Sequence, residues 1–305
     1  MNVRSLFMAF SVAAAFLVCN EAWPAGPLTK GTLVFVANPS GNWELFVLRA
    51  GASSAVQLTR TPLDERAPSL SPDGKRVAYA TSDGALWVME LATARTAMVR
   101  VPKGTYGYPS WLRDGSGILY TSYQYTPPQE DADVYVHLFK TGTSKLFLMQ
   151  TGPQDYASLS PNGDRVAYVS SIATTLPGFG STVTQQVWVA SLRLGTPSQL
   201  FMGSAHDTRP AWSRDGRSLA FSSSRSGRPE IWIADASGRS AAAQVSTGPG
   251  AKFSPTWSPD GMEIAYTSTV SGKSELEVLD IRNKSTRKLK VFGARPVEIR
   301  EPDWR

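Results

Sequence analysis

The chain has 305 residues, a formal net charge of +6 and a 42% share of hydrophobic residues. This composition supports a folded hydrophobic core and argues against a wholly disordered chain. The Lys and Arg residues are scattered, with no run of five or six, whereas nucleic-acid binding usually requires a concentrated basic stripe. We therefore expect no nucleic-acid partner.

Residues 1–25 have the pattern of a signal peptide. Arg4 precedes an uncharged apolar run of 14 residues, Leu6 to Cys19, which is short for a bilayer span but typical of a secretory leader. Cleavage is expected between residues 22 and 26, which would place the mature protein in the periplasm or outside the cell. Two alternatives stay open, a lipid on Cys19 and a retained membrane anchor. Cys19 is the only cysteine, so a mature chain without it could form no disulfide or thiolate metal site.

Residues 31–305 contain a repeated phrase, of which W-S-P-D-G-M-E-I-A-Y-T-S-T (Trp257 to Thr269) is one copy. Its Pro-Asp-Gly or Pro-Asn-Gly portion is turn chemistry, with Arg in place of Pro in two copies, and a short, almost continuously apolar strand follows. Such strands are typical of sheets that are buried on both faces. The five copies are spaced 41, 48, 53 and 45 residues apart and begin at Leu70, Trp111, Leu159, Trp212 and Trp257.

Each turn and apolar strand is followed by a second strand of the type I-W-I-A-D-A (Ile231 to Ala236) and by a weaker outer strand. Four-stranded units that repeat every 40 to 50 residues predict the blades of a β-propeller. We expect the Pro-Asp-Gly turns to be structural.

The two ends of the chain together predict a sixth blade. E-P-D-W-R, residues 301–305, places Trp304 47 residues after Trp257, and the continuation of the phrase is found at Gly31 to Leu48. We therefore predict an all-β, six-bladed β-propeller of four-stranded antiparallel blades, closed by pairing the C-terminal strand with N-terminal strands. The alternative is that residues 301–305 form a frayed tail.

The phrase W-S-P-D-G-x-x-I-A-Y, combined with E-I-W-I-type strands, resembles the propeller repeat of the TolB family over residues 31–305. It lacks the G-H and W-D signatures of WD-type propellers. TolB proper has an α/β domain in front of its propeller, and the residues before 31 leave no room for one, so we expect the propeller part alone. The resemblance is specific for fold and weak for function, because the repeat also occurs in noncatalytic periplasmic proteins, serine peptidases and polysaccharide lyases. It leaves involvement of the Tol system open.

A candidate binding face lies where the chain enters each inner strand, at the mouth of the central channel. Two long segments expected to be loops, residues 123–133 and 173–186, lie on the same face, and long loops on a rigid scaffold often carry recognition. Aromatic and Arg residues are the usual anchors of such surfaces. The predicted partner-binding residues are Arg66, Tyr108, Asp155, Tyr156, His206, Asp207, Arg209, Phe253, Arg300 and Glu301.

The favoured function is noncatalytic recognition of a protein or peptide of the cell envelope by a monomer, with no catalytic residue, cofactor or metal assigned. The alternative is a lyase or hydrolase acting on a carbohydrate in the same channel through Asp155, Asp207 and His206. A small-ligand sensor is a third possibility.

Other catalytic and metal sites are weakly supported by the sequence. There is no G-x-S-x-G motif of a fused serine hydrolase. His137 lies in a predicted strand and should be packed there. A calcium site at Glu130, Asp131 and Asp133 is not favoured, because their spacing differs from the D-x-D-x-D-G loop.

Overall fold

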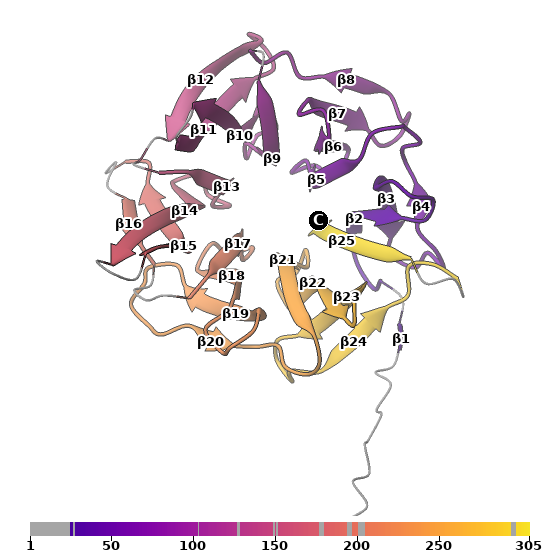
Figure 1. The fold of residues 1–305 in the computed structure, drawn as a ribbon. Helices are drawn as coiled ribbons and strands as arrows, with labels where there is room; N and C mark the ends of the chain where they lie inside the picture. The colour runs from indigo at the N-terminus through magenta and orange to yellow at the C-terminus, as the bar shows by residue number, and fades with distance from the viewer. Residues whose placement is uncertain are drawn as a thin grey trace, which may run out of the picture.

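The computed structural model describes residues 25–26, 28–102, 104–126, 129–148, 150, 152–176, 180–193, 197–200, 205–293 and 297–305. Every regular element in these residues is a β-strand, and the strands form six sheets arranged as a ring (Figure 1). The six-bladed, all-β propeller predicted from the repeat is therefore confirmed. Within the described ranges, no helix is long and apolar enough to cross a membrane.

Each blade has four antiparallel strands, of which the first lines the channel and the last lies at the outer edge of the ring (Figure 1). From the channel outward, blade 1 is β25–β2–β3–β4 (Glu298–Trp304, Thr32–Asn38, Glu44–Arg49, Val56–Gln57); blade 2 is β5–β6–β7–β8 (Glu65–Leu70, Arg76–Thr81, Leu86–Glu90, Thr96–Met98); blade 3 is β9–β10–β11–β12 (Thr105–Trp111, Gly117–Thr126, Gln129–Leu138, Thr143–Leu148). Blade 4 is β13–β14–β15–β16 (Gln154–Leu159, Arg165–Leu176, Gly180–Ser191, Pro197–Gln199); blade 5 is β17–β18–β19–β20 (Asp207–Trp212, Ser218–Ser223, Glu230–Asp235, Ala243–Gln244); blade 6 is β21–β22–β23–β24 (Ala251–Trp257, Glu263–Val270, Lys273–Asp280, Thr286–Leu289).

Blade 1 closes the ring, because its inner strand comes from the C-terminal end of the chain and its other strands from the N-terminal end. In the β2–β25 pair, Leu33 lies opposite Trp304 and Ala37 opposite Ile299. Trp304 is fully buried, so residues 301–305 are not a frayed tail and the predicted closure is confirmed. One additional strand was not predicted: β1 (Ala25–Gly26), at the end of the predicted signal peptide, pairs in parallel with β24 at the outer edge of blade 6.

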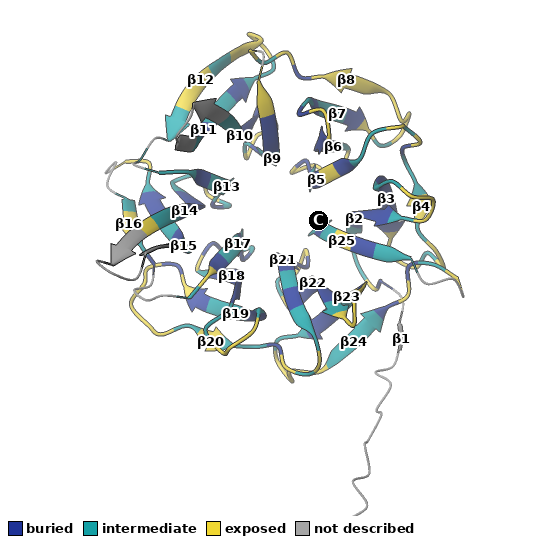
Figure 2. Cartoon of the chain, in the orientation of Figure 1, coloured by how far each residue is buried: buried dark blue, intermediate teal, exposed yellow. Residues whose placement is uncertain are grey.

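The hydrophobic core lies between neighbouring blades, and burial decreases toward the outer strands (Figure 2). One cluster joins Val34 and Leu45 of blade 1 to Leu70 and Val77 of blade 2. A blade therefore buries both faces only when it has a neighbour on each side, which explains the nearly continuous apolar runs in the sequence.

The repeated Trp at the end of the inner strand ties blades 3, 5 and 6 each to the preceding blade. The indole N–H of Trp111 donates to the carbonyl oxygen of Ser69 at 2.8 Å, and that of Trp212 to the carbonyl oxygen of Ser158 at 3.0 Å. Trp257 repeats this contact with the carbonyl oxygen of Ala211 at 3.0 Å. The Trp of the repeat thus fills the space between blades and satisfies a polar group of the neighbouring inner strand.

The repeated Ser-Pro-Asp-Gly turns are held by their own side chains. The hydroxyl of Ser71 donates to Asp73 Oδ1 at 2.5 Å and accepts the backbone N–H of Arg76 at 2.9 Å. Gly74 has a φ of 67°, which a residue with a side chain rarely adopts. These contacts agree with the expectation that the turns are structural.

The two segments expected to be long loops are instead extended hairpins. Strands β10 and β11 remain paired as far as Thr126 and Gln129, and β14 and β15 as far as Leu176 and Gly180. The prediction of loops over 123–133 and 173–186 was therefore wrong in conformation. Continued pairing satisfies the backbone polar groups that a long loop would have to bond by other means. Residues 127–128 and 177–179 at the tips lie outside the described residues.

Candidate functional site

Each inner strand contains a β-bulge at the channel, and one residue of each bulge has a left-handed backbone. The register shifts next to this residue in all six blades, and its φ lies between 48° and 57°. Residues other than glycine rarely adopt this conformation, and bulges are known to re-aim side chains. The six residues, which we call the bulge ring, are Ala67, Tyr108, Tyr156, Arg209, Ser254 and Glu301.

Four side chains of the bulge ring meet within the channel. The rings of Tyr108 and Tyr156 have centroids 4.1 Å apart, and the Tyr156 hydroxyl donates to that of Tyr108 at 3.2 Å. The guanidinium carbon of Arg209 lies 5.4 Å and 4.9 Å from the two ring centroids. Arg209 Nη2 donates to Glu301 Oε1 at 2.5 Å, and Glu301 Oε2 accepts the backbone N–H of Ala67 at 2.6 Å. The contacts thus link blades 3, 4, 5, 1 and 2 around the channel.

The charges of this cluster stabilise one another. Burial alone would raise the pKa of Glu301, but the positive charge of Arg209 and the N–H of Ala67 outweigh it and lower that pKa. Burial disfavours the charged form of Arg209, yet the attraction of Glu301 outweighs this and raises the pKa of Arg209. Arg209 and Glu301 therefore stay ionised, as a charge-assisted pair placed over two aromatic rings.

Asp155, which precedes Tyr156 of the cluster in β13, is bonded to the hairpin of blade 3. The hydroxyl of Tyr123 on β10 donates to Asp155 Oδ1 at 2.7 Å. Burial raises the pKa of Asp155, and the hydrogen bonds from Tyr123 and Thr121 oppose that change. Tyr123 lies in one of the ranges named from the sequence, but its role as the partner of Asp155 was not predicted.

The remaining predicted site residues are exposed or have other partners, although the positive charge of Arg66 also helps to lower the pKa of Glu301. Asp207 is buried and pairs with Arg225 Nη2 at 2.6 Å, and burial raises the pKa of Asp207. His206, Arg66 and Arg300 are exposed, and Phe253 is half-buried on β21. The guanidinium carbon of Arg300 lies 4.3 Å from the ring centroid of Trp43, a residue that sequence reasoning did not select.

The described residues give limited support to acid–base or metal chemistry. The carboxylates of Asp155 and Asp207 are bonded to different partners, Tyr123 and Arg225. Across the described ranges, no group of three or more His, Cys, Asp and Glu residues could hold a metal ion. The side chain of Glu130, part of the calcium alternative, is not among the side chains that the structure describes. His137 is buried with its Nδ1 3.0 Å from the Ser144 hydroxyl, which confirms that it is packed in a strand.

A cavity of about 370 Å³ occupies the channel on the turn side of the bulge ring. Its lining reaches from the bulge ring to residues of the turns, among them Pro72, Arg113, Pro161 and Arg214. These turns were expected to be structural only, so this cavity was not predicted.

Comparison with known proteins agrees with this architecture. The TolB beta propeller domain family, PD40, matches residues 108–289, which is more than half of the chain. The fold defines the class of protein as a six-bladed propeller, and the chain belongs to the TolB β-propeller domain family. The predicted family resemblance is thus confirmed.

Individual relatives cover only part of this architecture. A Protein TolB homolog of Chlorobium luteolum is 31% identical over 142 residues, covering 46% of this chain and 31% of that protein. One of Chlorobaculum tepidum is 34% identical over 108 residues, covering 34% of this chain and 24% of that protein. The chain thus matches about a third or less of the length of these curated relatives.

Similar solved structures extend over nearly the whole chain. TolB from Acinetobacter baumannii has a TM-score of 0.74 at 20% identity, covering 90% of this chain and 66% of that chain. An oligogalacturonate lyase in complex with manganese has a TM-score of 0.59 at 18% identity, covering 88% of this chain and 76% of that chain. At these identities the likeness shows the fold alone.

Proposed function

We propose that this protein is an exported, noncatalytic propeller that binds a protein or peptide partner of the cell envelope through the channel-mouth face. Membership of the TolB propeller family supports this proposal, as does the secretory pattern of residues 1–25. The observation that carries it is the exposed guanidinium of Arg300 placed 4.3 Å over the ring of Trp43 at the mouth. Arg and Trp are enriched among the residues that dominate binding energy at protein interfaces.

The surroundings of this pair suit a recognition surface. The Arg209–Glu301 cluster provides a fixed floor to the channel, and the extended hairpins β10–β11 and β14–β15 stand on the same face as the starts of the inner strands. Exposed Arg66 and His206 add donors that a partner could bond. A rigid scaffold with a few polar and aromatic anchors loses little conformational entropy when a partner binds.

The test is affinity capture from a cell-envelope extract with the wild type and the double variant Trp43→Ala, Arg300→Ala. The control is Arg282→Ala, which removes an exposed Arg paired with Asp280 in an outer turn of blade 6. We expect the mouth variant to lose a captured partner at least tenfold and the control to retain it, with unchanged melting temperatures for both. Equal capture by all three proteins would contradict the proposal.

The alternative function is a carbohydrate-active enzyme in the same channel, and the fold likeness to an oligogalacturonate lyase is its support. An assay of oligogalacturonate cleavage separates the two. Turnover by the wild type that is abolished by His206→Ala would favour the enzyme, whereas recognition through Trp43 and Arg300 predicts no turnover by either protein.

A further inference from the structure

The turn end of the central channel has an excess of positive charge. Among the residues that line the cavity are four arginines, Arg113, Arg209, Arg214 and Arg305, and two acidic residues, Glu301 and Asp303. Arg209 and Glu301 neutralise one another at 2.5 Å. Three guanidinium groups therefore remain with a single side-chain carboxylate and with the α-carboxylate of the last residue, Arg305, of which one oxygen accepts the backbone N–H of Thr32 at 2.6 Å.

The side-chain carboxylate, that of Asp303, is already bonded to the protein. Its Oδ2 accepts the backbone N–H of Leu70 at 2.6 Å, and its Oδ1 accepts the hydroxyl of Thr256 at 3.4 Å. These bonds join the inner strands of blades 1, 2 and 6. Asp303 thus satisfies neighbouring backbone and hydroxyl groups, and it compensates the three arginines only in part.

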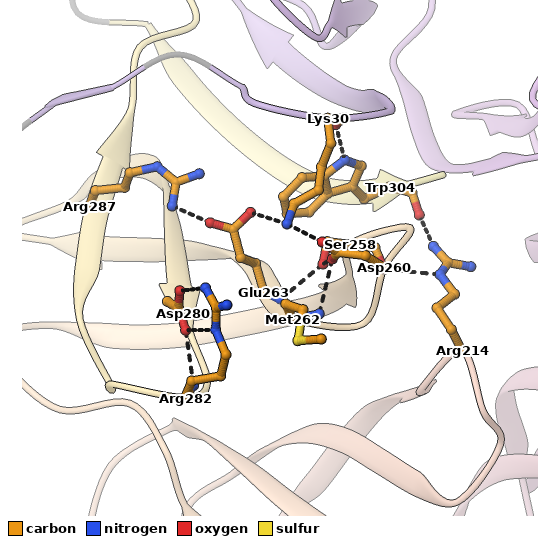
Figure 3. Close-up of polar contacts among 10 residues, drawn as sticks. All are labelled: Lys30, Arg214, Ser258, Asp260, Met262, Glu263, Asp280, Arg282, Arg287 and Trp304. Atoms are coloured by element: carbon orange, nitrogen blue, oxygen red, sulfur yellow. Dashed lines mark hydrogen bonds and ion pairs between the residues drawn. The ribbon is translucent and has the colours of Figure 1, made fainter.

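Arg214 is held in place by neutral oxygen atoms. It replaces Pro in the turn of blade 5, and its Nε donates to the carbonyl oxygen of Ser258 at 3.2 Å. Its Nη2 donates to the carbonyl oxygen of Trp257 at 2.9 Å. The same nitrogen also donates to the carbonyl oxygen of Trp304 (Figure 3). Carbonyl oxygens orient the guanidinium group but do not neutralise it.

The charge of Arg214 is consequently costly to the folded protein. Burial and the repulsion of Arg305 outweigh the attraction of Asp303 and lower the pKa of Arg214 to about 10. An anion that binds beside a half-buried cation without a carboxylate partner would therefore relieve an uncompensated charge.

The three arginines surround the channel axis. Arg113, Arg214 and Arg305 follow the ends of β9, β17 and β25, which are the inner strands of every second blade in the ring (Figure 1). Pro72 and Pro161 line the cavity in blades between them. An anion on the axis would therefore have a lining Arg in three of the six blades, with prolines, tryptophans and hydroxyl residues such as Ser69 and Thr256 elsewhere in the wall.

We propose that the turn end of the channel binds a small organic oxyanion with two or more negative charges, a phosphate ester or a polycarboxylate, among Arg113, Arg214 and Arg305. A volume of about 370 Å³ lies in the range of small-ligand pockets, and guanidinium groups match the geometry of carboxylate and phosphate oxygens. The prolines and indoles of the wall would contact the carbon skeleton. This site lies at the opposite end of the channel from the face proposed to bind a partner.

The test is isothermal titration calorimetry of the full chain with citrate and with inorganic phosphate at constant ionic strength. The variant is Arg113→Gln, Arg305→Gln, because both side chains are exposed and Arg113 has only a weak bond to the Asn162 carbonyl oxygen at 3.4 Å. Arg214 is left intact because its bonds join blades. The control is Arg217→Gln, an exposed Arg that follows the turn of blade 5 and does not line the cavity.

We expect the wild type and the control to bind citrate or phosphate equally and the double variant to bind at least tenfold more weakly. Binding of both anions would indicate that charge dominates, and binding of citrate alone that the wall selects an organic skeleton. The proposal is overturned if the wild type binds neither anion, or if the double variant binds as the control does. Unchanged melting temperatures of the ligand-free proteins would establish that the loss is not a loss of folding.

Discussion

The indole N–H of Trp304 donates to the backbone carbonyl oxygen of Lys30 at 2.8 Å, although the two residues are 274 positions apart in the chain. The ammonium group of Lys30 in turn lies 2.5 Å from Asp260 Oδ2 and 3.3 Å from Glu263 Oε2 of blade 6 (Figure 3). Arg287 Nη1 contacts the other oxygen of Glu263 at 2.6 Å. Lys30 therefore joins the C-terminal strand to blade 6 at the closure of the ring.

Replacement of Trp304 by Ala should destabilise the protein by about 3–5 kcal/mol, the usual cost of truncating a large buried aromatic residue. Trp304 is fully buried in the cluster between blades 6 and 1. Deletion of residues 301–305 should cost at least as much, because it also removes much of β25. Urea unfolding measures the change, with the exposed Val56→Ala as control. A loss below about 1 kcal/mol would contradict the role assigned to the closure.

The stability of the protein should depend on pH through Glu65. This carboxyl group is buried and accepts the hydroxyls of Thr59 at 3.0 Å and Thr61 at 2.8 Å. Burial, reinforced by the nearby Glu44, raises the pKa of Glu65 from 4.5 to about 7. Since the folded state holds this proton more tightly than the unfolded state, the contribution is complete below pH 4.5 and is lost as the pH rises through 7.

The pKa difference of Glu65 corresponds to about 3 kcal/mol across this range. The variant Glu65→Gln keeps the hydrogen-bonding shape without the charge, so its stability relative to the wild type should increase between about pH 5 and pH 8. Urea unfolding at both pH values measures the change, with the exposed Glu90→Gln as control. A difference between variant and wild type that does not change with pH would exclude Glu65 as the titrating group.

Removal of one partner of the Arg209–Glu301 pair should cost more than removal of both. Glu301→Gln leaves the Arg209 guanidinium without its carboxylate, which should cost up to about 3 kcal/mol, since both side chains are mostly buried. Stabilities of the single variants and of Arg209→Gln, Glu301→Gln form a double-mutant cycle. We expect a coupling free energy of about 0.5–3 kcal/mol. Additive losses would show that the pair does not act as a unit.

Replacement of the bulge-ring residue Ala67 by glycine should stabilise the protein, in contrast to the same change at a position of regular strand geometry. Ala67 has a φ of 49°, a conformation that costs an L-residue about 1–2 kcal/mol and costs glycine little. Because glycine also has a more flexible unfolded state, we expect a net gain of about 0.5 kcal/mol for Ala67→Gly. Ala78→Gly in β6 should lose about 1 kcal/mol. Urea midpoints test both, and equal losses would refute the strain argument.

The sequence was sufficient to predict the propeller, because five of the six blades repeat the same turn and strand chemistry and the two chain ends supply the strands of the sixth. Ser71, Asp73 and Gly74 hold one turn through contacts within a few residues, and Trp111 packs against an element only one blade away. Similar residues at similar spacing therefore form similar blades. The position before the repeated Pro also located the channel, since that residue is the bulge residue in all six blades.

The parts that were missed depend on contacts between distant segments. Nothing near Asp207 indicated that its carboxylate would be bonded to Arg225, and nothing near Arg113 indicated that Arg214 and Arg305 would line the same cavity. Continued pairing of the two long hairpins was also missed, because polar residues in those segments are compatible with either loops or solvent-exposed strands.

The order in which blade 1 is assembled has a consequence for the newly made chain. Strand β2 is among the first propeller strands to leave the ribosome, yet its inner edge is covered only by β25, and residues 39–297 are translated in between. During that time β2 presents unpaired backbone groups to which another copy of the chain can pair. Variants that weaken the β2–β25 pairing at Trp304 should therefore yield strand-exchanged oligomers, in which β25 of one molecule pairs with β2 of the next.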